Sequence, residues 1–527
     1  MQIEKRAWMG VVNLFRNAPV IIETVRYPLL HSIAPARLKF TQFRKDLDFV
    51  LTQINFDGQM APKKQYVFAI GIVGLLLFNL LQAGYTELLD DESYYWMYSQ
   101  HLDWGYYDHP PMVAWMIHAG YSLFPNTIGV RLFAVLAITV CAYIMYALQK
   151  PYNPIRLVII ILSLGLIHFG GMLAVPDIPL VLFSAIYLWV YQRYLKKETW
   201  LNTILLGVCM AALLYSKYQG LLFIILCVLA NIKLLTDKKF WIATLLCAIL
   251  LTPHIYWQVV HGYPSLQFYI GERFSTTTYH FSNTTDYILG QLFLFGPLIG
   301  WMFFFAVYKQ KVNGDIWIRT LKTIVIGVLG FFFLATLKGR MEVNWTAIAI
   351  IPAILLLHYY LETAPGMERV LYRLFPFSLI IIFSIRIAMI WNLVGNKVAI
   401  NKELHNNPVW TGLIREKARV YPVYFINSYQ EASKYIYYQH GEATSYNGVG
   451  YRNNQYDFWK PETKWFQDSI LVVSVERAHV SSDSIVSTQG KLYCKMFVNP
   501  NIFSNYSFYR QMPRRKELVH FLRKDKK

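Results

Sequence analysis

The chain has 527 residues, a formal net charge of +19, 55% hydrophobic residues, 15% charged residues and a mean hydropathy of +0.32. This composition excludes an ordinary soluble domain and indicates an integral membrane protein. The basic residues are spread around the loops between apolar runs and form no nucleic-acid reading motif, so we expect no nucleic-acid partner. The five cysteines include no CxxC pair, which argues against a disulfide framework or a zinc knuckle.

Residues 1–62 form a mixed, net-basic extension with scattered apolar groups and no secretory signal. We expect this extension to be cytoplasmic and in part an amphipathic segment at the membrane surface. The motif Met60-Ala-Pro-Lys-Lys stands directly before the first apolar run and resembles a natural bacterial start. Part of the extension is therefore expected to be a start-site artefact.

Apolar runs of about 15–24 residues, close to the length that a bilayer requires, occupy residues 63–393. The sequence predicts eleven spans, near 66–84, 127–149, 154–173, 177–195, 201–215, 219–234, 238–256, 284–307, 320–337, 345–361 and 375–393. Lysine and arginine concentrate in one alternate set of loops, which should be cytoplasmic by the positive-inside rule. The other loops and the C-terminal region then share the extracytoplasmic face, opposite a cytoplasmic N-terminus.

The first extracytoplasmic loop is acidic and aromatic. Between Tyr85 and Asn126 it carries six carboxylates, three histidines, ten aromatic residues and no lysine or arginine. Charge held beside lipid is costly and usually marks a working site, whereas a solvated surface loop would not need so many rings. We expect its tryptophans and tyrosines to lie in the membrane interface.

Three further turns on the same face carry polar groups. Asp177 follows Pro176 at the start of an apolar run, where a carboxylate can also act as a plain helix cap. Lys217 lies in a tight turn, where it can also extend to lipid headgroups. The third turn, 338–345, is dense in polar residues between two apolar runs.

From residue 394 the pattern changes to short apolar runs with charges throughout. Residues 421–427 and 469–475 predict buried strands, and 429–440 predict a helix. We therefore expect residues 394–527 to form an extracytoplasmic α/β domain with a basic tail.

Clustered carboxylates, isolated cations and aromatic rings thus meet on one face. A carboxylate there suits general-base work on a hydroxyl, and cations at the outer leaflet suit a lipid phosphate. Together they predict transfer of a group from a lipid phosphate to a hydroxyl acceptor. Asp90, Asp91, Glu92 and His109 also offer ligands for a divalent metal, but their spacing matches no specific signature, so metal and cofactor dependence stay open.

These residues also resemble the GT-C membrane glycosyltransferases that use polyprenyl-phosphate sugars, which include protein O-mannosyltransferases, the lipid A aminoarabinose transferase and core galacturonosyltransferases. The resemblance covers about Tyr66 to Phe458. It is carried by Asp91-Glu92, Gly105-Tyr-Tyr-Asp-His-Pro-Pro111, Arg131 and Pro176-Asp-Ile-Pro-Leu180, and less strongly by Lys217-Tyr218, Trp257 with His261, Gln291, Glu342-Val-Asn344-Trp345, Tyr429-Gln-Glu-Ala and Tyr451–Trp459.

The resemblance implies inverting transfer by single displacement in a bacterial cytoplasmic membrane, with Asp91 as general base. Glu92 would orient Asp91 or bind acceptor, and Asp177 would be a second carboxylate at the acceptor or sugar. The implied donor-phosphate contacts are Lys217 first, then Arg131, Lys338 and Arg340. The implied substrate pocket contains Tyr94, Tyr107, Asp108, His109, Trp257, His261, Glu342 and Asn344. Gln258 stands where many relatives have Asn, which puts the detailed interpretation of that loop in doubt.

Three other classes remain as alternatives: a lipid-linked sugar transporter or flippase, a lipid-phosphate phosphatase or phosphotransferase, and a non-catalytic partner in a membrane complex. A transporter would place polar groups at mid-bilayer, whereas here they lie at span ends. The sequence names neither the sugar nor the acceptor, which could be a lipid, a glycan or a protein.

Overall fold

The computed structural model describes residues 61–149, 153–268, 279–393, 403–447, 451–459, 469–474, 483–487 and 490–497. The expected N-terminal extension and the basic tail lie outside these residues, apart from 61–62. In chain order the first helices are α4 (Ala61–Tyr85), α5 (Asp90–Gln100), α6 (Met112–Leu123), α7 (Thr127–Leu148), α8 (Pro154–Leu162), α9 (Gly165–Phe169), α10 (Asp177–Lys196), α11 (Trp200–Ser216), α12 (Gln219–Ala230) and the 3-10 helix η2 (Ile232–Thr236).

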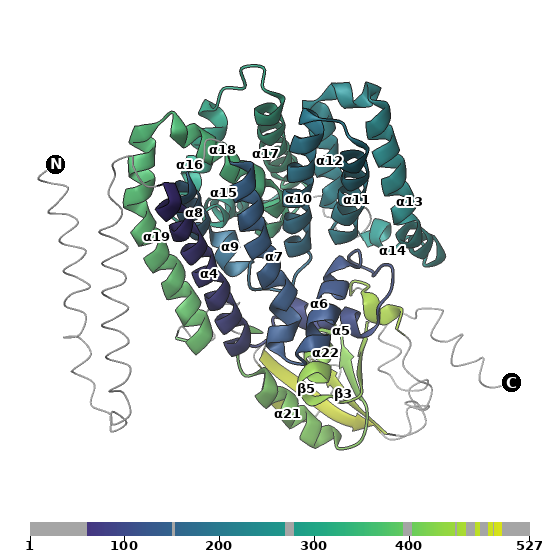
Figure 1. The fold of residues 1–527 in the computed structure, drawn as a ribbon. Coiled ribbons are helices and arrows are strands. Elements are labelled where there is room, and N and C mark those ends of the chain that lie inside the picture. The colour runs from purple at the N-terminus through teal and green to yellow at the C-terminus, as the bar shows by residue number, and fades with distance from the viewer. Residues whose placement is uncertain are drawn as a thin grey trace, which may run out of the picture. The chain divides into compact units, whose positions relative to one another are not determined.

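The remaining elements complete the bundle and form a C-terminal unit (Figure 1). They are α13 (Lys238–Val260), α14 (Pro264–Leu266), α15 (Phe281–Leu294), α16 (Gly300–Lys309), α17 (Ile316–Ala335), η4 (Val343–Ala349), α18 (Ile350–Glu362), α19 (Pro365–Trp391), α21 (Asn407–Ala418), β1 (Val423–Ile426), α22 (Tyr429–Gln439), β2 (Ala443–Tyr446), η6 (Gln455–Asp457), β3 (Ile470–Ser474), β4 (Asp483–Ser487) and β5 (Gly490–Phe497).

Every predicted apolar run is wholly or mostly helical, and the multi-pass helical membrane fold is confirmed. In the described part of the chain, seven helical stretches are long and apolar enough to cross a membrane: α4, α7, α10, α13, α17, α19, and η4 together with α18. α11 and α12 are apolar but shorter. The predicted count of eleven spans is not confirmed, because some runs divide into two shorter helices.

One such division lies between α15 and α16. The sequence predicts a continuous span over 284–307, but the chain turns at Gly296, whose φ is +125°. A side chain is strained in that conformation, and a Cβ at Gly296 would also lie 2.6 Å from the carbonyl oxygen of Ser163. Similarly, the predicted span 154–173 is divided into α8 and α9. Apolar composition alone does not reveal these breaks.

Helix starts follow ordinary capping chemistry. The side chains of Asn126, Thr199, Asp237 and Asp315 accept hydrogen bonds from backbone N–H groups in the first turns of α7, α11, α13 and α17, respectively. These short polar side chains satisfy donors that have no partner inside the helix. These caps fix where each of the four helices begins.

The C-terminal residues form the predicted α/β unit. Its sheet has the strand order β2-β1-β3-β5-β4. β1 pairs in parallel with β2 and β3, while β5 pairs antiparallel with β3 and β4. β1, α22 and β3 lie where the sequence predicts strand, helix and strand, and both of these strands are fully buried.

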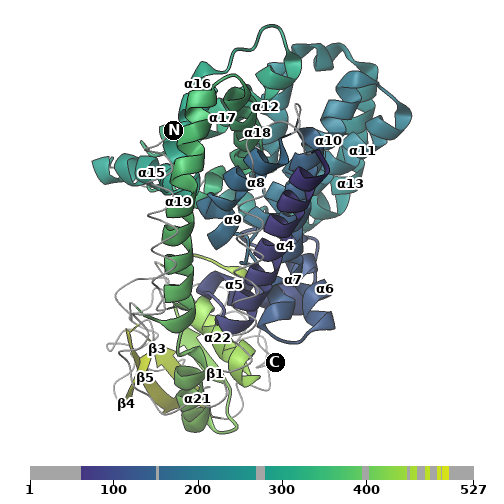
Figure 2. The same ribbon diagram turned by 60° about the vertical axis from the view of Figure 1, so that its left-hand side comes forward.

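The aromatic residues of the acidic loop contribute to a core shared with this C-terminal unit. Tyr94, Trp96 and Tyr98 of α5 pack in one cluster with Tyr429 and Tyr437 of α22, and the two helices lie side by side in both views (Figures 1 and 2). These rings therefore pack against protein, and their position at the membrane interface stays a prediction. Packing against protein removes more of their surface from water and gives their hydroxyls partners.

Candidate active site

The site begins at the N-terminus of α5, where Asp91 is recessed. Asp91 is exposed to solvent, while residues 92–99, which follow it on the helix, are all buried. The surrounding protein nevertheless raises the pKa of its carboxyl to about 6, with burial as the largest cause. A carboxylate that solvent reaches but that protein surrounds can titrate near neutral pH, as a general base must.

Charged groups from several parts of the chain act on Asp91. Arg452 lowers its pKa, whereas Asp90, Asp108 and Glu342 raise it. His109 lies within the field of Lys217 and Arg452, which together with burial, the largest cause, hold its pKa well below the usual range. The structure thus places Asp108 and Glu342 within electrostatic reach of Asp91, and Lys217 within reach of His109, while Arg452 acts on both Asp91 and His109.

Glu92 and Arg131 form a buried ion pair. Arg131 Nη2 lies 2.5 Å and Nε 2.8 Å from the Glu92 carboxylate, and both side chains are fully buried. Arg131 also donates to carbonyl oxygens of Ala83, Thr86 and Glu87 at 2.8–3.1 Å. Glu92 accepts from the backbone N–H of Leu89 at 3.1 Å and of Ala174 at 2.9 Å. This pair, the Glu92–Arg131 clamp, therefore joins α4, α5, α7 and the segment before α10.

The clamp bears on the roles that the resemblance implies. All three guanidinium nitrogens of Arg131 already donate hydrogen bonds to protein atoms. This geometry favours a supporting role for Arg131 over a donor-phosphate contact. Glu92 is likewise engaged by the clamp and the backbone, which favours positioning of its neighbour Asp91 over direct contact with an acceptor.

Asp177 is held by side chains from two distant turns. One carboxylate oxygen lies 2.8 Å from Lys217 Nζ, and the other accepts from Asn344 Nδ2 at 2.8 Å. Asp177 and Lys217 are both buried, whereas Asn344 is exposed. The alternative of a plain helix cap is disfavoured, since both oxygens take side-chain partners. The three turns that the sequence singled out thus meet at one point.

The residues that lead into the loop Gly105–Pro111 are anchored on α13. Trp257 Nε1 donates to Asp103 Oδ2 at 2.7 Å, and its ring stacks on His261 with centroids 4.3 Å apart. His254 Nδ1 bonds the carbonyl oxygen of Trp104 at 2.7 Å. Trp257 is buried, so it supports the loop from behind and does not line an open surface.

Gln258 connects this loop to the turn that carries Lys217. Its Nε2 donates to Tyr218 Oη at 3.1 Å and to Ser265 Oγ at 2.9 Å. Ser265 in turn donates to the carbonyl oxygen of Tyr107 at 3.0 Å. The longer side chain that departs from the family pattern therefore has a defined place, as a bridge between two walls of the site.

Gly105 should not tolerate a side chain. A Cβ at this position would lie 2.5 Å from Trp257 Cε3, so Gly105→Ala must displace a buried ring. We expect a loss of about 1–3 kcal/mol of stability and reduced turnover, measured by thermal unfolding and by activity. Gly330→Ala is the matched control because open space surrounds its Cβ position; an equal loss there would contradict the steric account.

Tyr94 and Tyr107 attach the acidic loop to the segment 451–459. The Tyr94 hydroxyl accepts from the backbone N–H of Gln455 at 2.7 Å, and the Tyr107 N–H donates to Gln455 Oε1 at 2.8 Å. Both rings are buried. These two predicted pocket residues therefore stabilise the wall of the site from inside.

Arg452 is the residue whose place the sequence did not predict. Its guanidinium lies between the rings of Tyr429 and Phe268, 4.8 and 5.4 Å from their centroids. It donates to the Tyr429 hydroxyl and lies 3.4 Å from Asp108 Oδ1. The motifs around Tyr429 and Tyr451–Trp459 were visible in the sequence, but nothing in their spacing showed that Arg452 pairs with Asp108.

The remaining predicted residues lie toward the edges of the site. Lys338, Arg340 and Asn344 are exposed, and Glu342 and His261 are half-buried. His261 Nδ1 bonds the carbonyl oxygen of Trp257 at 2.8 Å. Of the four proposed phosphate contacts, Arg131 belongs to the clamp, Lys217 is buried beside Asp177, and Lys338 and Arg340 are exposed.

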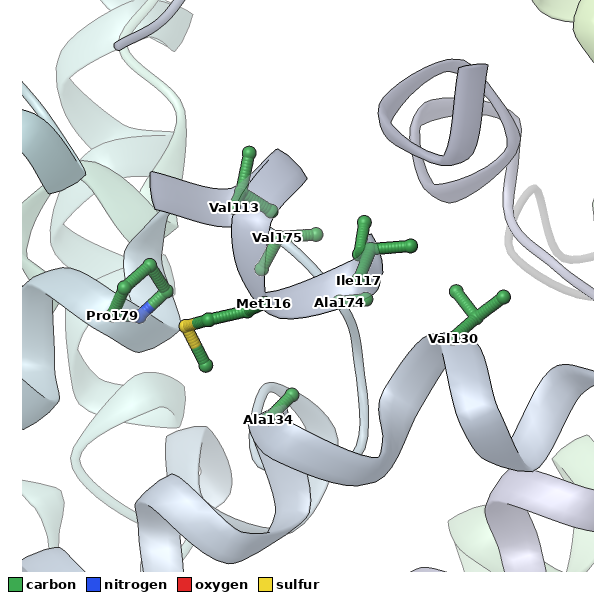
Figure 3. Close-up of a pocket in the computed structure, with 8 residues that line it drawn as sticks. All are labelled: Val113, Met116, Ile117, Val130, Ala134, Ala174, Val175 and Pro179. Atoms are coloured by element: carbon green, nitrogen blue, oxygen red, sulfur yellow. The ribbon is translucent and has the colours of Figure 1, made fainter. Parts of the chain in front are cut away.

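A small apolar cavity lies behind the segment that leads to Asp177 (Figure 3). Side chains of α6 and α7 converge there on Ala174, Val175 and Pro179; they are Val113, Met116, Ile117, Val130 and Ala134. The lining is apolar, so the cavity offers no polar contact to a substrate. The cavity lies next to Ala174, whose backbone N–H donates to Glu92.

In the described part of the chain, no group of three or more His, Cys, Asp or Glu side chains is arranged to hold a metal ion. Two of the four predicted ligands have other close partners, since Asp90 lies 2.5 Å from Lys434 Nζ and Glu92 belongs to the clamp. The geometry therefore assigns these two carboxylates to ion pairs.

Comparisons with known proteins relate this chain to membrane glycosyltransferases. Residues 108–257 match the family model described as dolichyl-phosphate-mannose-protein mannosyltransferase. The lipid A galacturonosyltransferase RgtD of Rhizobium johnstonii is 22% identical over 329 residues, which are 59% of this chain and 68% of RgtD. The family match includes Asp108, Asp177 and Lys217, and so covers much of the site.

The fold is shared with ArnT from Cupriavidus metallidurans. The crystal structure of ArnT bound to undecaprenyl phosphate matches with a TM-score of 0.58 and 12% identity, over 84% of this chain and 98% of ArnT. The apo structure matches with the same TM-score and 13% identity, over 82% and 98% of the two chains. The resemblance to GT-C glycosyltransferases is thus confirmed, and the glycosyltransferase interpretation is supported over the transporter.

Proposed function

We propose that this chain, a membrane glycosyltransferase of the GT-C class, moves a sugar from a polyprenyl-phosphate donor to a hydroxyl on a lipid acceptor at the extracytoplasmic face of a bacterial cytoplasmic membrane. The observation that carries the proposal is the recessed carboxylate of Asp91, which lies within electrostatic reach of Arg452 and of further carboxylates. A lipid-linked donor is supported by the undecaprenyl phosphate in the ArnT crystal, and a lipid A acceptor by the name of RgtD.

In the proposed reaction Asp91 takes the proton of the acceptor hydroxyl. The resulting oxygen nucleophile attacks the anomeric carbon from the face opposite the phosphate, so the configuration at that carbon inverts. The bond between the anomeric carbon and the phosphate oxygen breaks, and polyprenyl phosphate leaves with the bonding electron pair. A positioned carboxylate of this kind contributes about 10²–10⁴-fold to the rate.

Lys217 is proposed to bind the donor phosphate. Its ammonium has three N–H donors, so it can contact a phosphate oxygen while keeping its 2.8 Å ion pair with Asp177. Negative charge grows on the phosphate as the sugar departs, and a fixed cation stabilises that charge most in the transition state. Asp177 holds the ammonium in place, and its other carboxylate oxygen accepts from Asn344. Lys338 and Arg340 are proposed to guide the donor near the surface.

The proposal can be tested with purified protein in nanodiscs. The donors are undecaprenyl-phosphate sugars carrying galacturonic acid, aminoarabinose or mannose, the acceptor is lipid A, and the product is read by mass spectrometry. We expect one donor to add its sugar mass to lipid A. Movement of labelled donor across vesicles without any transfer would instead support the flippase alternative and overturn this proposal.

Activity should depend on pH through Asp91. Because a general base must be unprotonated, and the pKa of the Asp91 carboxyl is raised to about 6, kcat/KM should rise with pH and reach half its plateau near pH 6. The measurement is kcat/KM from pH 4.5 to 8 at constant ionic strength. A profile that is flat through this range would show that the rate-limiting step does not require this carboxylate as base.

A further inference from the structure

Asp90 stands directly before the proposed base and has no role in the proposed reaction. Its Oδ1 lies 2.5 Å from Nζ of Lys434, a residue of α22 whose side chain is only 1% exposed. The two helices α5 and α22 pack against each other and lie side by side in both views (Figures 1 and 2). A buried lysine of the C-terminal α/β unit therefore reaches the residue next to Asp91.

Lys434, Asp90 and Glu403 form a closed ring of polar contacts. The Lys434 ammonium donates to the backbone carbonyl oxygen of Glu403 at 2.9 Å, and a carboxylate oxygen of Glu403 accepts from the backbone N–H of Asp90 at 3.2 Å. Leu89, at the N-cap of α5, carries an apolar side chain that cannot accept a hydrogen bond. Glu403 thus satisfies a free N–H in the first turn of α5 from outside the helix.

The residues that lead into α5 are held by the same unit. The Glu87 carboxylate accepts from two backbone N–H groups at the start of α21, at 2.7 and 3.1 Å, where the helix dipole favours negative charge. The backbone N–H of Leu88 donates to the hydroxyl of Tyr438 on α22 at 2.8 Å. Contacts with the C-terminal unit therefore fix Glu87, Leu88 and Asp90 in the chain before Asp91.

We propose that Lys434 is a positioning residue for Asp91, which acts through Asp90 by fixing the first turn of α5. This inference rests on the proposed role of Asp91 as general base. Because the Asp91 side chain is exposed, its place depends on the backbone turn that carries it. A catalytic group displaced by about 1 Å can cost about 10²-fold in rate, so the ring of contacts bears directly on kcat.

Removal of the Lys434 ammonium leaves Asp90 and Glu403 without the cation between them, and their like charges then push the turn apart. Removal of both charges of the Lys434–Asp90 pair leaves no unpaired buried ion, so much of the stability should return. The contact that fixes the turn stays absent in that double variant. Stability and kcat should therefore separate, which a purely structural role would not produce.

The test uses the full-length protein in nanodiscs, with lipid A and whichever of the three undecaprenyl-phosphate sugars transfers to it. We expect Lys434→Met to lower kcat by about 10²-fold with little change in the KM for the donor, and Lys434→Arg to recover part of the loss. The double variant Asp90→Asn with Lys434→Met should regain thermal stability but not kcat. Arg419→Met, at an exposed arginine of the same unit, should match wild type.

Tyr438→Phe provides a second test if Lys434→Met does not fold. It removes only the hydroxyl that holds Leu88, and it should lower kcat in the same direction by a smaller factor. Wild-type kcat in both Tyr438→Phe and Lys434→Arg would then overturn the inference.

The outcomes separate this inference from the proposed function. If Asp91→Asn keeps wild-type turnover, the proposed base is wrong and the inference falls with it. If Asp91→Asn is inactive but Lys434→Met keeps its kcat, or the double variant regains kcat together with stability, the inference alone is overturned. A loss that disappears at pH 9 would show that Lys434 acts on the charge of Asp91 and not on its place, and would also overturn it. A lower kcat that persists at pH 9 supports both.

Discussion

Asp91→Asn is expected to lower turnover by about 10²–10⁴-fold while the protein still folds and inserts. Asparagine keeps the shape of the side chain but cannot take a proton from the acceptor. Because Asp91 is exposed and the residues after it on α5 carry the packing, the loss should reflect chemistry and not unfolding. The measurement is single-turnover transfer with saturating donor. Asp286→Asn, an exposed aspartate on α15, should keep full activity.

The same variant should gain stability, by an amount that depends on pH. Folding raises the pKa of the Asp91 carboxyl from 3.8 to about 6, so the folded state binds more protons than the unfolded state between these values. Stability then falls as pH rises through this window and stays lower above it. Asp91→Asn should therefore unfold at a higher temperature than wild type above pH 6 and at nearly the same temperature below pH 4.

The sequence predicted where helices begin better than whether a long apolar run forms one unbroken helix. α7, α10 and α13 begin within a residue of the predicted starts because a capping side chain or a proline precedes an apolar run in each case. The division at Gly296 was missed, since it depends on the φ of one glycine and on the approach of Ser163 from another helix. Hydropathy averages over a window and does not register either feature.

In the site, likewise, the sequence predicted individual charged residues but not their contact partners. Asp91, Asp177 and Lys217 were visible because charge stands out beside apolar runs. The partners of the site residues were not visible, because they lie far away in the sequence. Glu92 and Arg131 are 39 residues apart, and Asp108 and Arg452 are 344 residues apart. The sequence assigned Arg131 and Lys217 the same role, as phosphate contacts. The structure distinguishes them: all three guanidinium nitrogens of Arg131 donate to protein atoms, whereas Lys217 pairs with Asp177.

The Glu92–Arg131 clamp carries the largest expected effect on stability. Arg131→Met should cost about 3–5 kcal/mol, because it leaves the fully buried Glu92 carboxylate without its cation and the carbonyl oxygens of Ala83 and Thr86 without a donor. Glu92→Gln should be destabilising as well, since it leaves a buried guanidinium unpaired. Unfolding of purified variants in detergent, followed by thermal or chemical denaturation, measures the change.

The double variant Glu92→Gln with Arg131→Met distinguishes a clamp from two separate contacts. Removing both charges avoids an unpaired buried ion, so the double variant should lose less stability than the two single losses added together. Arg369→Met, at an exposed arginine of α19, should stay within about 0.5 kcal/mol of wild type. Strictly additive losses, or an Arg131→Met protein of normal stability that binds the donor weakly, would instead return Arg131 to the role of a phosphate contact.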